Sequence, residues 1–583
     1  MPAHVAKVSS IALTAALSGI VAPVHAAAPP ALESADGMVV TAQHLASDVG
    51  AAILRQGGNA IDAAVAVGYA LAVTHPCCGN LGGGGFMTIH LADGRNTFIN
   101  FREKAPLAAR ADMFLDAQGN PVGDKSLNGY LAAGVPGTVM GLETARREYG
   151  TLPRPTLMAP SIRLAEEGFI LTRGDVDELD AGTAEFRAQP NVAAIFLHQG
   201  APFKPGERLV QHDLAATLRA VSADGAAVFY HGAIAGAVAA ASRANGGLLT
   251  PQDFAAYEIT ESAPISCHYR GYTILSAPPP SSGGVAVCEM LQVLEAYPLG
   301  TLGFHSSDSV HLMTEAMRYA YRDRNTYLGD PAFVENPIAR LLSTHHIESI
   351  RARIQPHRAT PSSALGNVAA AGEKATTTHY SIVDGKGNAV SVTYTINDDF
   401  GAKVIAGDTG FFLNDEMDDF TAKPGAANLF GLVQGKANAI APGKRPLSSM
   451  TPTIVLKDGK PVLVVGTPGG SRIITTVLEV IVNVIDHGMT LQEAVDAPRI
   501  HHQWWPDTIA AEPFALSADT VKSLTGMGYK VTALEPWGAG NAAEAIGIAP
   551  TDPQSAKALG FPRPAVLYGA HDSRAPAGSA AAP

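Results

Sequence analysis

One segment constrains the fold most, because it has the pattern of a tight antiparallel hairpin. Residues 377–395 read "TTHYSIVDGKGNAVSVTYT", with two runs rich in threonine, tyrosine, valine and isoleucine on either side of Gly-Lys-Gly. These residue types favour strands, and glycine supplies the positive φ that a short hairpin loop needs. The sequence therefore predicts two paired strands joined by a three-residue loop at 385–387.

That loop fixes which residues face each other. Asp384 then lies opposite Asn388, and counting back along both strands places Thr377 opposite Thr395. Directly opposed residues share one face of a sheet, with Cβ atoms about 5 Å apart. A loop one residue longer or shorter would move Thr395 to the other face. We therefore expect a pair of threonine hydroxyls at the open end of the hairpin.

The segment before the hairpin indicates how one of these threonines gains reactivity. Residues 356–374 are rich in alanine, serine, proline and glycine without periodicity, which predicts a flexible segment. A flexible segment that ends at a strand is typical of an internal processing site. A threonine at a new N-terminus carries its own base, an α-amine with a pKa of about 7.7 to 8.0. On composition alone, a threonine-rich, half-exposed strand remains the alternative.

Charged residues in two other segments suit a zwitterionic ligand. "FREKAP" places Arg102 at the end of a predicted strand, where a guanidinium can clamp a carboxylate. "NDEMDDF" offers Glu416 and Asp419, three residues apart, to an ammonium group. The alternatives are a surface ion pair for the arginine and a solvated loop for the two acids.

Two further segments supply neutral donors. "KRPLSSM" offers the Ser448 and Ser449 hydroxyls and amides to a carboxylate. "GTPGGSR" offers the adjacent backbone N–H groups of Gly469 and Gly470 to a developing oxyanion. Ordinary tight turns are the alternative for both segments.

The remaining chain predicts a large globular protein. Its 583 residues exceed one ordinary core, which predicts either two domains or one large layered domain. The net charge of −12 argues against a nucleic-acid partner. Helices are expected over 41–73 with a break at Gly57-Gly58, and over most of 135–355. Strands are expected at 86–91 and 96–101, and the tail 574–583 is expected to be disordered.

The first residues are typical of a secretory signal. One lysine precedes an apolar run from Val8 to Val21, and Val24 and Ala26 suit the small-residue rule for cleavage. We therefore expect a signal peptide over 1–26 and a periplasmic or secreted protein. A membrane anchor is the alternative, but the run is shorter than the roughly 20 apolar residues that span a bilayer.

Neither a cofactor nor a metal is expected. The glycine loop "GNLGGGGF" lacks the lysine of a phosphate loop and does not match GxGxxG, so it predicts close backbone packing. Neither "HHQWW" nor "HLMTE" has a zinc spacing. The four cysteines, at 77, 78, 267 and 288, predict buried small side chains, and their pairing stays open.

Taken together, these segments resemble one family. "THPCCGNLGGGGFM", "FREKAP", "PPPSSGG", "YLGDP", "TTHYSIVD", "GNAVSVTYTIN", "LNDEMDDF", "KRPLSSMTPTIV" and "GTPGGSRIITTV" are similar to the signatures of gamma-glutamyltransferase (gamma-glutamyl transpeptidase), in family order, from about Thr41 to Arg574. The resemblance implies an α+β fold, the αββα sandwich of N-terminal-nucleophile hydrolases. It also implies that the precursor cuts itself between Thr376 and Thr377. The large subunit would be residues 27–376 and the small subunit 377–583, which form a heterodimer within one αββα unit.

The resemblance also assigns roles to the matched residues. Thr377 would be the nucleophile that forms a γ-glutamyl ester, and Thr395 would support it. The resemblance implies that the acyl group would come from glutathione or a related γ-glutamyl compound, and that water, an amino acid or a peptide would accept it. The substrate α-carboxylate would be bound by Arg102, Ser448 and Ser449. The α-ammonium would be bound by Asn397, Glu416 and Asp419, and the oxyanion would be stabilised by Gly469 and Gly470.

One departure and two rival functions remain. Phe430 stands where many bacterial relatives have a lid tyrosine, so the balance between hydrolysis and transfer is open. A cephalosporin or glutaryl acylase of the same superfamily is the nearest rival, but its acyl group lacks the ammonium that Glu416 and Asp419 suit. The other rival is an inactive periplasmic glutathione-binding protein, which the intact pair of Thr377 and Thr395 disfavours.

Overall fold

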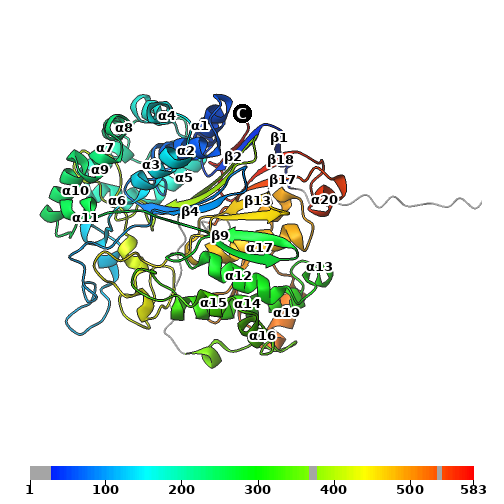
Figure 1. Ribbon diagram of the computed structural model, residues 1–583. Helices are drawn as coiled ribbons and strands as arrows, with labels where there is room; N and C mark the ends of the chain where they lie inside the picture. Colours follow the sequence, from blue (N-terminus) through cyan, green and yellow to red (C-terminus); the bar gives the residue numbers. More distant parts are fainter. Residues whose placement is uncertain (1–27, 367–376, 535–540) are drawn as a thin grey trace, which may run out of the picture.

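Two stacked sheets form the centre of the molecule, and helices cover their outer faces (Figure 1). The computed structural model describes residues 28–366, 377–534 and 541–583. The first sheet has the order β19 (Ser579–Ala581), β2 (Gly37–Thr41), β10 (Thr378–Asp384), β11 (Ala389–Thr395), β3 (Gly84–His90), β4 (Asn96–Asn100) and β7 (Thr260–Ser262). The second has the order β1 (Leu32–Ser34), β18 (Leu567–His571), β17 (Glu544–Ile548), β13 (Lys460–Gly466), β12 (Thr453–Lys457), β9 (Tyr272–Ser276) and β8 (Ile265–Tyr269).

The facing surfaces of the sheets form an apolar layer. Met38, Val40 and Val383 of the first sheet belong to one buried cluster with Ile454 and Val464 of the second. Alternate residues of each strand point into this layer, because successive side chains of a strand face opposite sides. The layer joins strands from both ends of the chain, so the sheets form one unit rather than two domains.

Apolar helices cover the outer faces. Helices α1 (His44–Arg55) and α2 (Ala60–Thr74) lie on the first sheet, and every residue of α2 is buried. Helices α12 (Gly283–Leu294), α14 (Ser307–Tyr327) and α17 (Ile473–Ile485) form the layer on the second sheet. This helix–sheet–sheet–helix order confirms the predicted αββα sandwich.

The predicted hairpin and its register are confirmed. Strands β10 and β11 pair antiparallel, with Thr378 opposite Tyr394 and Val383 opposite Ala389. The Asp384 N–H donates to the Asn388 carbonyl at 3.1 Å, and Gly387 takes the positive φ of the loop at +93°. The next pair in this register is Thr377 and Thr395.

The glycine loop serves close packing, as predicted. A Cβ added to Gly82 would lie 2.0 Å from the Phe412 carbonyl oxygen, and one added to Gly83 would lie 1.9 Å from the Thr395 carbonyl oxygen. These residues must therefore be glycine for β3 to lie against the chain that leaves β11.

Of two further predictions of secondary structure, the helical span was confirmed and the disordered tail was wrong. The span 135–355 is largely helical, but it also contains β8 and β9, which extend the second sheet. The tail is not disordered, since β19 pairs with β2 and places Ser579 opposite Thr41. Backbone hydrogen bonds hold this edge strand, and its alanine-rich sequence carries no apolar alternation from which to predict it.

The cysteines pair within their own neighbourhoods. Cys267 of β8 is bonded to Cys288 of α12, and Cys77 is bonded to the adjacent Cys78. No helix among the described residues is long and apolar enough to cross a membrane. The predicted signal peptide and the residue Thr376 lie outside the described residues.

Candidate active site

The open end of the hairpin brings two hydroxyls together. Thr377 Oγ1 lies 3.2 Å from Thr395 Oγ1, and both residues are buried. The Asn397 N–H donates to Thr395 Oγ1 at 2.9 Å. Because that oxygen already accepts one hydrogen bond, the Thr395 proton is well placed to point at Thr377. This arrangement holds the Thr377 oxygen while leaving its own proton for a base.

The backbone at Thr377 is strained. Its φ is +148°, a region that β-branched residues rarely occupy. Such a conformation costs on the order of 1–3 kcal/mol and persists where the surrounding structure imposes it. The strain lies at the residue that directly precedes β10, next to the predicted cut.

A buried guanidinium and two carboxylates form the charged part of the site. Arg102 is ion-paired with Glu416 and with Asp419, and its Nε donates to the Pro446 carbonyl at 3.3 Å. Glu103 lies 3.6 Å from the same guanidinium. Burial raises the pKa of Glu416 well above its ordinary value, and the charge of Arg102 opposes that rise. The structure therefore has these groups paired with each other, whereas the sequence prediction treated them as separate poles.

The loop that contains Ser448 and Ser449 is hydrogen-bonded to a second loop, which contains Pro280 and Ser282. The Ser448 N–H donates to the Pro280 carbonyl at 2.8 Å, and its own carbonyl accepts from the Ser282 N–H and hydroxyl. The Met450 N–H donates to Ser448 Oγ at 3.0 Å. The proline-rich segment before α12 thereby fixes the backbone that presents both serines.

Phe430 closes the site from the side of the glycine pair. The φ of Gly470 is +55°, and a Cβ there would lie 2.3 Å from the Phe430 ring. Phe430 is only 4% exposed, and its carbonyl accepts from Gln503 at 3.2 Å. A side chain at residue 470 would therefore displace the ring.

These groups line one small cavity. It holds about 20 Å³ of water-accessible space, which is room for about one water molecule. The lining includes every site residue predicted from the sequence except two. Gly469 is not in the lining, although its neighbour Gly470 is, and the processing residue Thr376 lies outside the described residues. The lining consists of Arg102, Thr377, Thr395, Asn397, Glu416, Asp419, Phe430, Ser448, Ser449, Met450, Gly470 and Ile473.

Sequence reasoning missed one charged group beside this cavity. Arg324 of α14 is 1% exposed, and its Nη2 donates to Ser449 Oγ at 3.1 Å. A signal was available, because Val310, Met317 and Arg324 are spaced by seven residues and share one face of the helix. An arginine on an otherwise apolar helix face indicates a buried charge.

A buried histidine beside the nucleophile makes the fold sensitive to acid. Burial lowers the pKa of His379 to about 3, and its ring contacts the Thr393 hydroxyl at 2.8 Å. In the unfolded chain this imidazole titrates near pH 6.5. Below pH 6.5 the unfolded state binds a proton that the folded state does not, so the free energy of unfolding falls as the pH falls from 6.5 towards 3.

We expect a His379→Gln variant to lose much of this dependence. The fully buried imidazole contributes at most about 1.4 kcal/mol per pH unit in that window. Urea unfolding at pH 4.5, 5.5 and 6.5 measures the slope for parent and variant. The parent slope should exceed the variant slope by about 1 kcal/mol per pH unit, and equal slopes would contradict the assignment.

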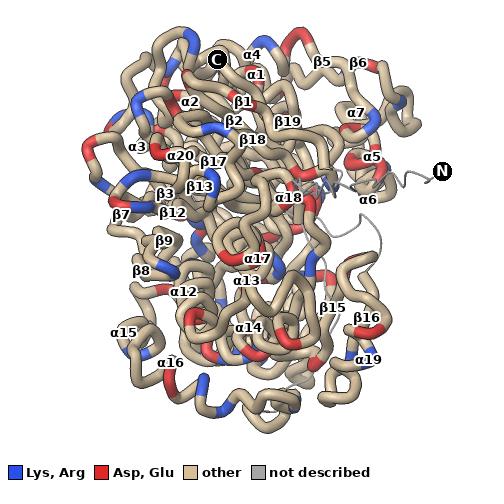
Figure 2. The backbone as a smooth tube through the Cα atoms, turned by 90° about the vertical axis from the view of Figure 1, so that its right-hand side faces the viewer, with Lys and Arg blue, Asp and Glu red and all other residues tan. Residues whose placement is uncertain are grey.

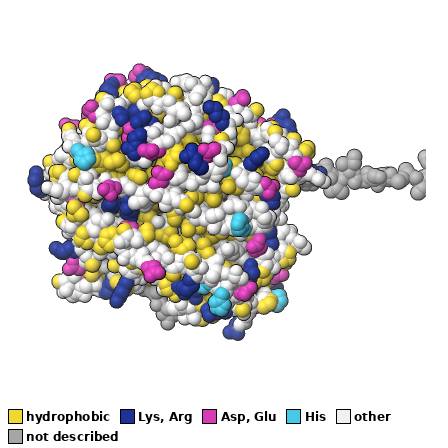
Figure 3. Space-filling view, in the orientation of Figure 1, with side chains coloured by type: hydrophobic (Ala, Val, Ile, Leu, Met, Phe, Trp, Pro, Cys, Tyr) yellow, Lys and Arg dark blue, Asp and Glu magenta, His cyan; other side chains and the backbone are white. Residues whose placement is uncertain are grey.

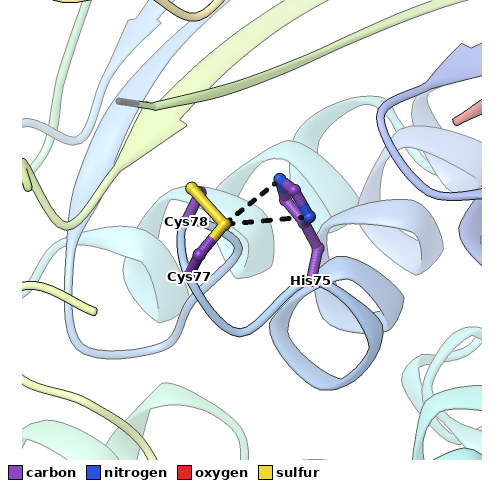
Figure 4. A group of neighbouring side chains, drawn as sticks. All are labelled: His75, Cys77 and Cys78. Carbon is purple, nitrogen blue, oxygen red and sulfur yellow. Dashed lines mark hydrogen bonds between the residues drawn. A yellow bond between two sulfur atoms is a disulfide. The ribbon is translucent and has the colours of Figure 1, made fainter. Parts of the chain in front are cut away.

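Two other groups contain candidate metal ligands among the described residues. In the first, shown in Figure 4, His75 lies against Cys77 Sγ at 3.6 and 3.8 Å. The two sulfur atoms of this group are bonded to each other, so neither is a thiolate ligand. In the second, His346 pairs with Asp323 at 2.7 Å and lies 3.6 Å from Glu289. No residue of either group is among those that line the cavity.

The surface carries charges of both signs. Figure 3 shows Lys and Arg interspersed with Asp and Glu over the face in view, and Figure 2 shows residues of both signs distributed along the backbone. Such a mixture is typical of a solvated protein surface.

Comparisons with known proteins identify relatives of this chain. The family model described as gamma-glutamyltranspeptidase matches residues 46–582. A glutathione hydrolase proenzyme of Pseudomonas sp. (strain A14) is 56% identical over 97% of both chains. One of Escherichia coli (strain K12) is 49% identical, over 91% of this chain and 93% of the relative.

A solved structure supports the same fold. Cephalosporin acylase from Bacillus halodurans superposes with a TM-score of 0.81 at 27% identity, over 97% of this chain and 99% of that one. The family match covers the hairpin, the charged group and the glycine pair described above. This chain is an enzyme that belongs to the gamma-glutamyltranspeptidase family.

Proposed function

We propose that this enzyme cleaves itself before Thr377 and then transfers γ-glutamyl groups from glutathione and related amides to water or to amines. One observation carries the proposal: Thr377 Oγ1 lies 3.2 Å from Thr395 Oγ1, in the same cavity as Arg102, Glu416 and Asp419. A reactive hydroxyl beside groups of both charges suits an acyl group that ends in an α-amino acid.

Processing follows from the position of Thr377. Its Oγ attacks the carbonyl carbon of Thr376, the C–N bond breaks, and the hydroxyl proton passes to the departing nitrogen. Water hydrolyses the resulting ester, which restores the hydroxyl and leaves a free α-amine on Thr377. Cleavage also removes the peptide bond that holds φ at +148°, so it releases the strain at this residue.

The processed threonine then acts on the donor. Its α-amine takes the Oγ proton, the oxygen attacks the γ-carbonyl, and the amine of the donor leaves with a proton. The backbone N–H groups of Gly469 and Gly470 stabilise the oxyanion. Water or an acceptor amine attacks the γ-glutamyl ester and frees Thr377.

The α-amino acid end of the donor replaces the ion pairs present in the cavity. The α-carboxylate of the donor binds to Arg102, Ser448 and Ser449. Its α-ammonium binds to Asn397, Glu416 and Asp419. The cavity has room for about one water molecule. Phe430 and the ion-paired side chains of Arg102, Glu416 and Asp419 must therefore move to admit the donor. Phe430 offers no hydroxyl to Asn397, so this side of the cavity is held closed by the packing of its ring on Gly470 and by the backbone hydrogen bonds of Phe430 to Gln503 and Asn428.

The second candidate is a glutaryl or cephalosporin acylase, favoured by the structural similarity to cephalosporin acylase. A glutaryl group carries a carboxylate but no ammonium, so Glu416 and Asp419 would have no cationic partner on that donor. The signal peptide predicted from the sequence supports a location in the periplasm or outside the cell. Its partners are small donors and acceptors, and its two subunits form a heterodimer.

Donor selectivity tests this proposal directly. We expect the processed enzyme to hydrolyse γ-glutamyl-p-nitroanilide at least about tenfold faster, in kcat/KM, than glutaryl-p-nitroanilide. A charge-assisted hydrogen bond contributes about 1.5–3 kcal/mol, which corresponds to a tenfold or larger preference. Release of p-nitroaniline measures both rates, and a preference for the glutaryl donor would favour the acylase.

A further inference from the structure

Arg324 lies beside the cavity, and the described residues do not compensate its charge by a close ion pair. Its guanidinium donates to Ser282 Oγ at 3.0 Å, to Asn325 and Gln434 side-chain oxygens at 2.9 Å, and to Ser449 Oγ at 3.1 Å. All four acceptors are neutral. Among the described residues, no carboxylate oxygen lies within 4.0 Å of its nitrogens, and the side chain is 1% exposed.

Burial of such a positive charge is energetically unfavourable unless an anion pairs with it. An isolated buried ion loses several kcal/mol of hydration, and proteins normally pair it. Burial lowers the pKa of Arg324 to about 10, although the charge of Asp419 opposes that fall. The contrast with Arg102 is direct, because two carboxylates already neutralise that residue.

The hydrogen bond to Ser449 directs the charge towards the cavity. Ser449 Oγ accepts from Arg324, so its own proton is available to a second acceptor. Ser449 lines the cavity with Thr377, and Arg324 does not. The positive charge of Arg324 would therefore attract an anion bound to the Ser449 hydroxyl without contacting that anion directly.

We propose that Arg324 is a positioning residue for the donor carboxylate: it orients the Ser449 hydroxyl and supplies the positive charge that selects donors with a carboxylate at that end. The inference rests on the proposed function for the identity of the donor. It adds a residue from outside the cavity to the recognition of that donor.

A set of three donors separates this role from a structural one. γ-Glutamyl-p-nitroanilide carries both charges, glutaryl-p-nitroanilide carries only the carboxylate, and 4-aminobutyryl-p-nitroanilide carries only the ammonium. In Arg324→Gln we expect kcat/KM to fall about 10- to 100-fold for both carboxylate donors, mainly through KM. For the 4-aminobutyryl donor it should stay within about twofold.

Two variants complete the design. Arg324→Lys retains the charge and should recover part of the loss, whereas Arg322→Gln, on the same helix and paired with Asp323, should leave the donor pattern unchanged. An equal fall on all three donors in Arg324→Gln would show a structural role and overturn the inference.

A binding measurement keeps the two proposals distinct. Calorimetry with glutarate on the processed protein tests the carboxylate site without any turnover. Weaker glutarate binding in Arg324→Gln than in the parent supports the inference, and equal binding overturns it. If the parent hydrolyses no γ-glutamyl donor, the proposed function fails while glutarate binding still decides the role of Arg324.

Discussion

Thr377→Ala should leave the protein as one uncut chain with no measurable γ-glutamyl hydrolysis. The substitution removes the hydroxyl that attacks the Thr376 carbonyl and, after processing, the donor. Loss of a covalent nucleophile typically lowers turnover by about 10⁴-fold or more. Denaturing gel electrophoresis measures processing, and p-nitroaniline release measures turnover.

Neighbouring substitutions make this result specific. Thr377→Ser retains a hydroxyl and a future α-amine, so it should be cut and retain activity. Thr378 is buried on the opposite face of β10, directly opposite Tyr394, so Thr378→Ala should also be cut. Cleavage of the Thr377→Ala chain at the same bond, or a parent that remains whole, would contradict the mechanism.

The hairpin was predictable because all its determinants are local. Strand propensity, the alternation of side chains and a short glycine loop together fix the register. The helix break at Gly57-Gly58 is local in the same sense, and α1 ends at Arg55 and α2 begins at Ala60. The pairing of Thr377 with Thr395 could therefore be read from 19 consecutive residues of sequence.

The parts that could not be predicted depend on distant contacts. Strand β19 exists because β2, more than 500 residues earlier, offers an unpaired edge. Arg102 and Glu416 are separated by 314 residues, so sequence alone indicated suitable groups but not that they pair with each other. The helix periodicity indicated that Arg324 is buried, but its place beside the cavity could not be predicted, because its neighbours Ser449 and Gln434 come from other segments.

Arg102→Gln should both destabilise the enzyme and abolish donor recognition. The change leaves the carboxylates of Glu416 and Asp419 buried without their cation. Removal of one partner from a buried ion pair costs about 3–5 kcal/mol of folding free energy. The donor carboxylate also loses its guanidinium, so kcat/KM should fall at least about 100-fold. Urea unfolding and p-nitroaniline release measure the two effects.

The double variant Arg102→Gln with Glu416→Gln separates stability from recognition. It removes one buried negative charge together with the positive one, so at least about half of the lost folding free energy should return. Hydrolysis of the γ-glutamyl donor should not return, because the double variant still lacks the guanidinium that takes the α-carboxylate. If activity recovered in proportion to stability, Arg102 would serve only to neutralise Glu416 and Asp419. Because Glu416→Gln alone also removes a ligand of the α-ammonium, the single Glu416→Gln variant is the control. A clearly larger loss of activity in the double variant than in Glu416→Gln would show that the guanidinium that neutralises Glu416 and Asp419 also binds the donor.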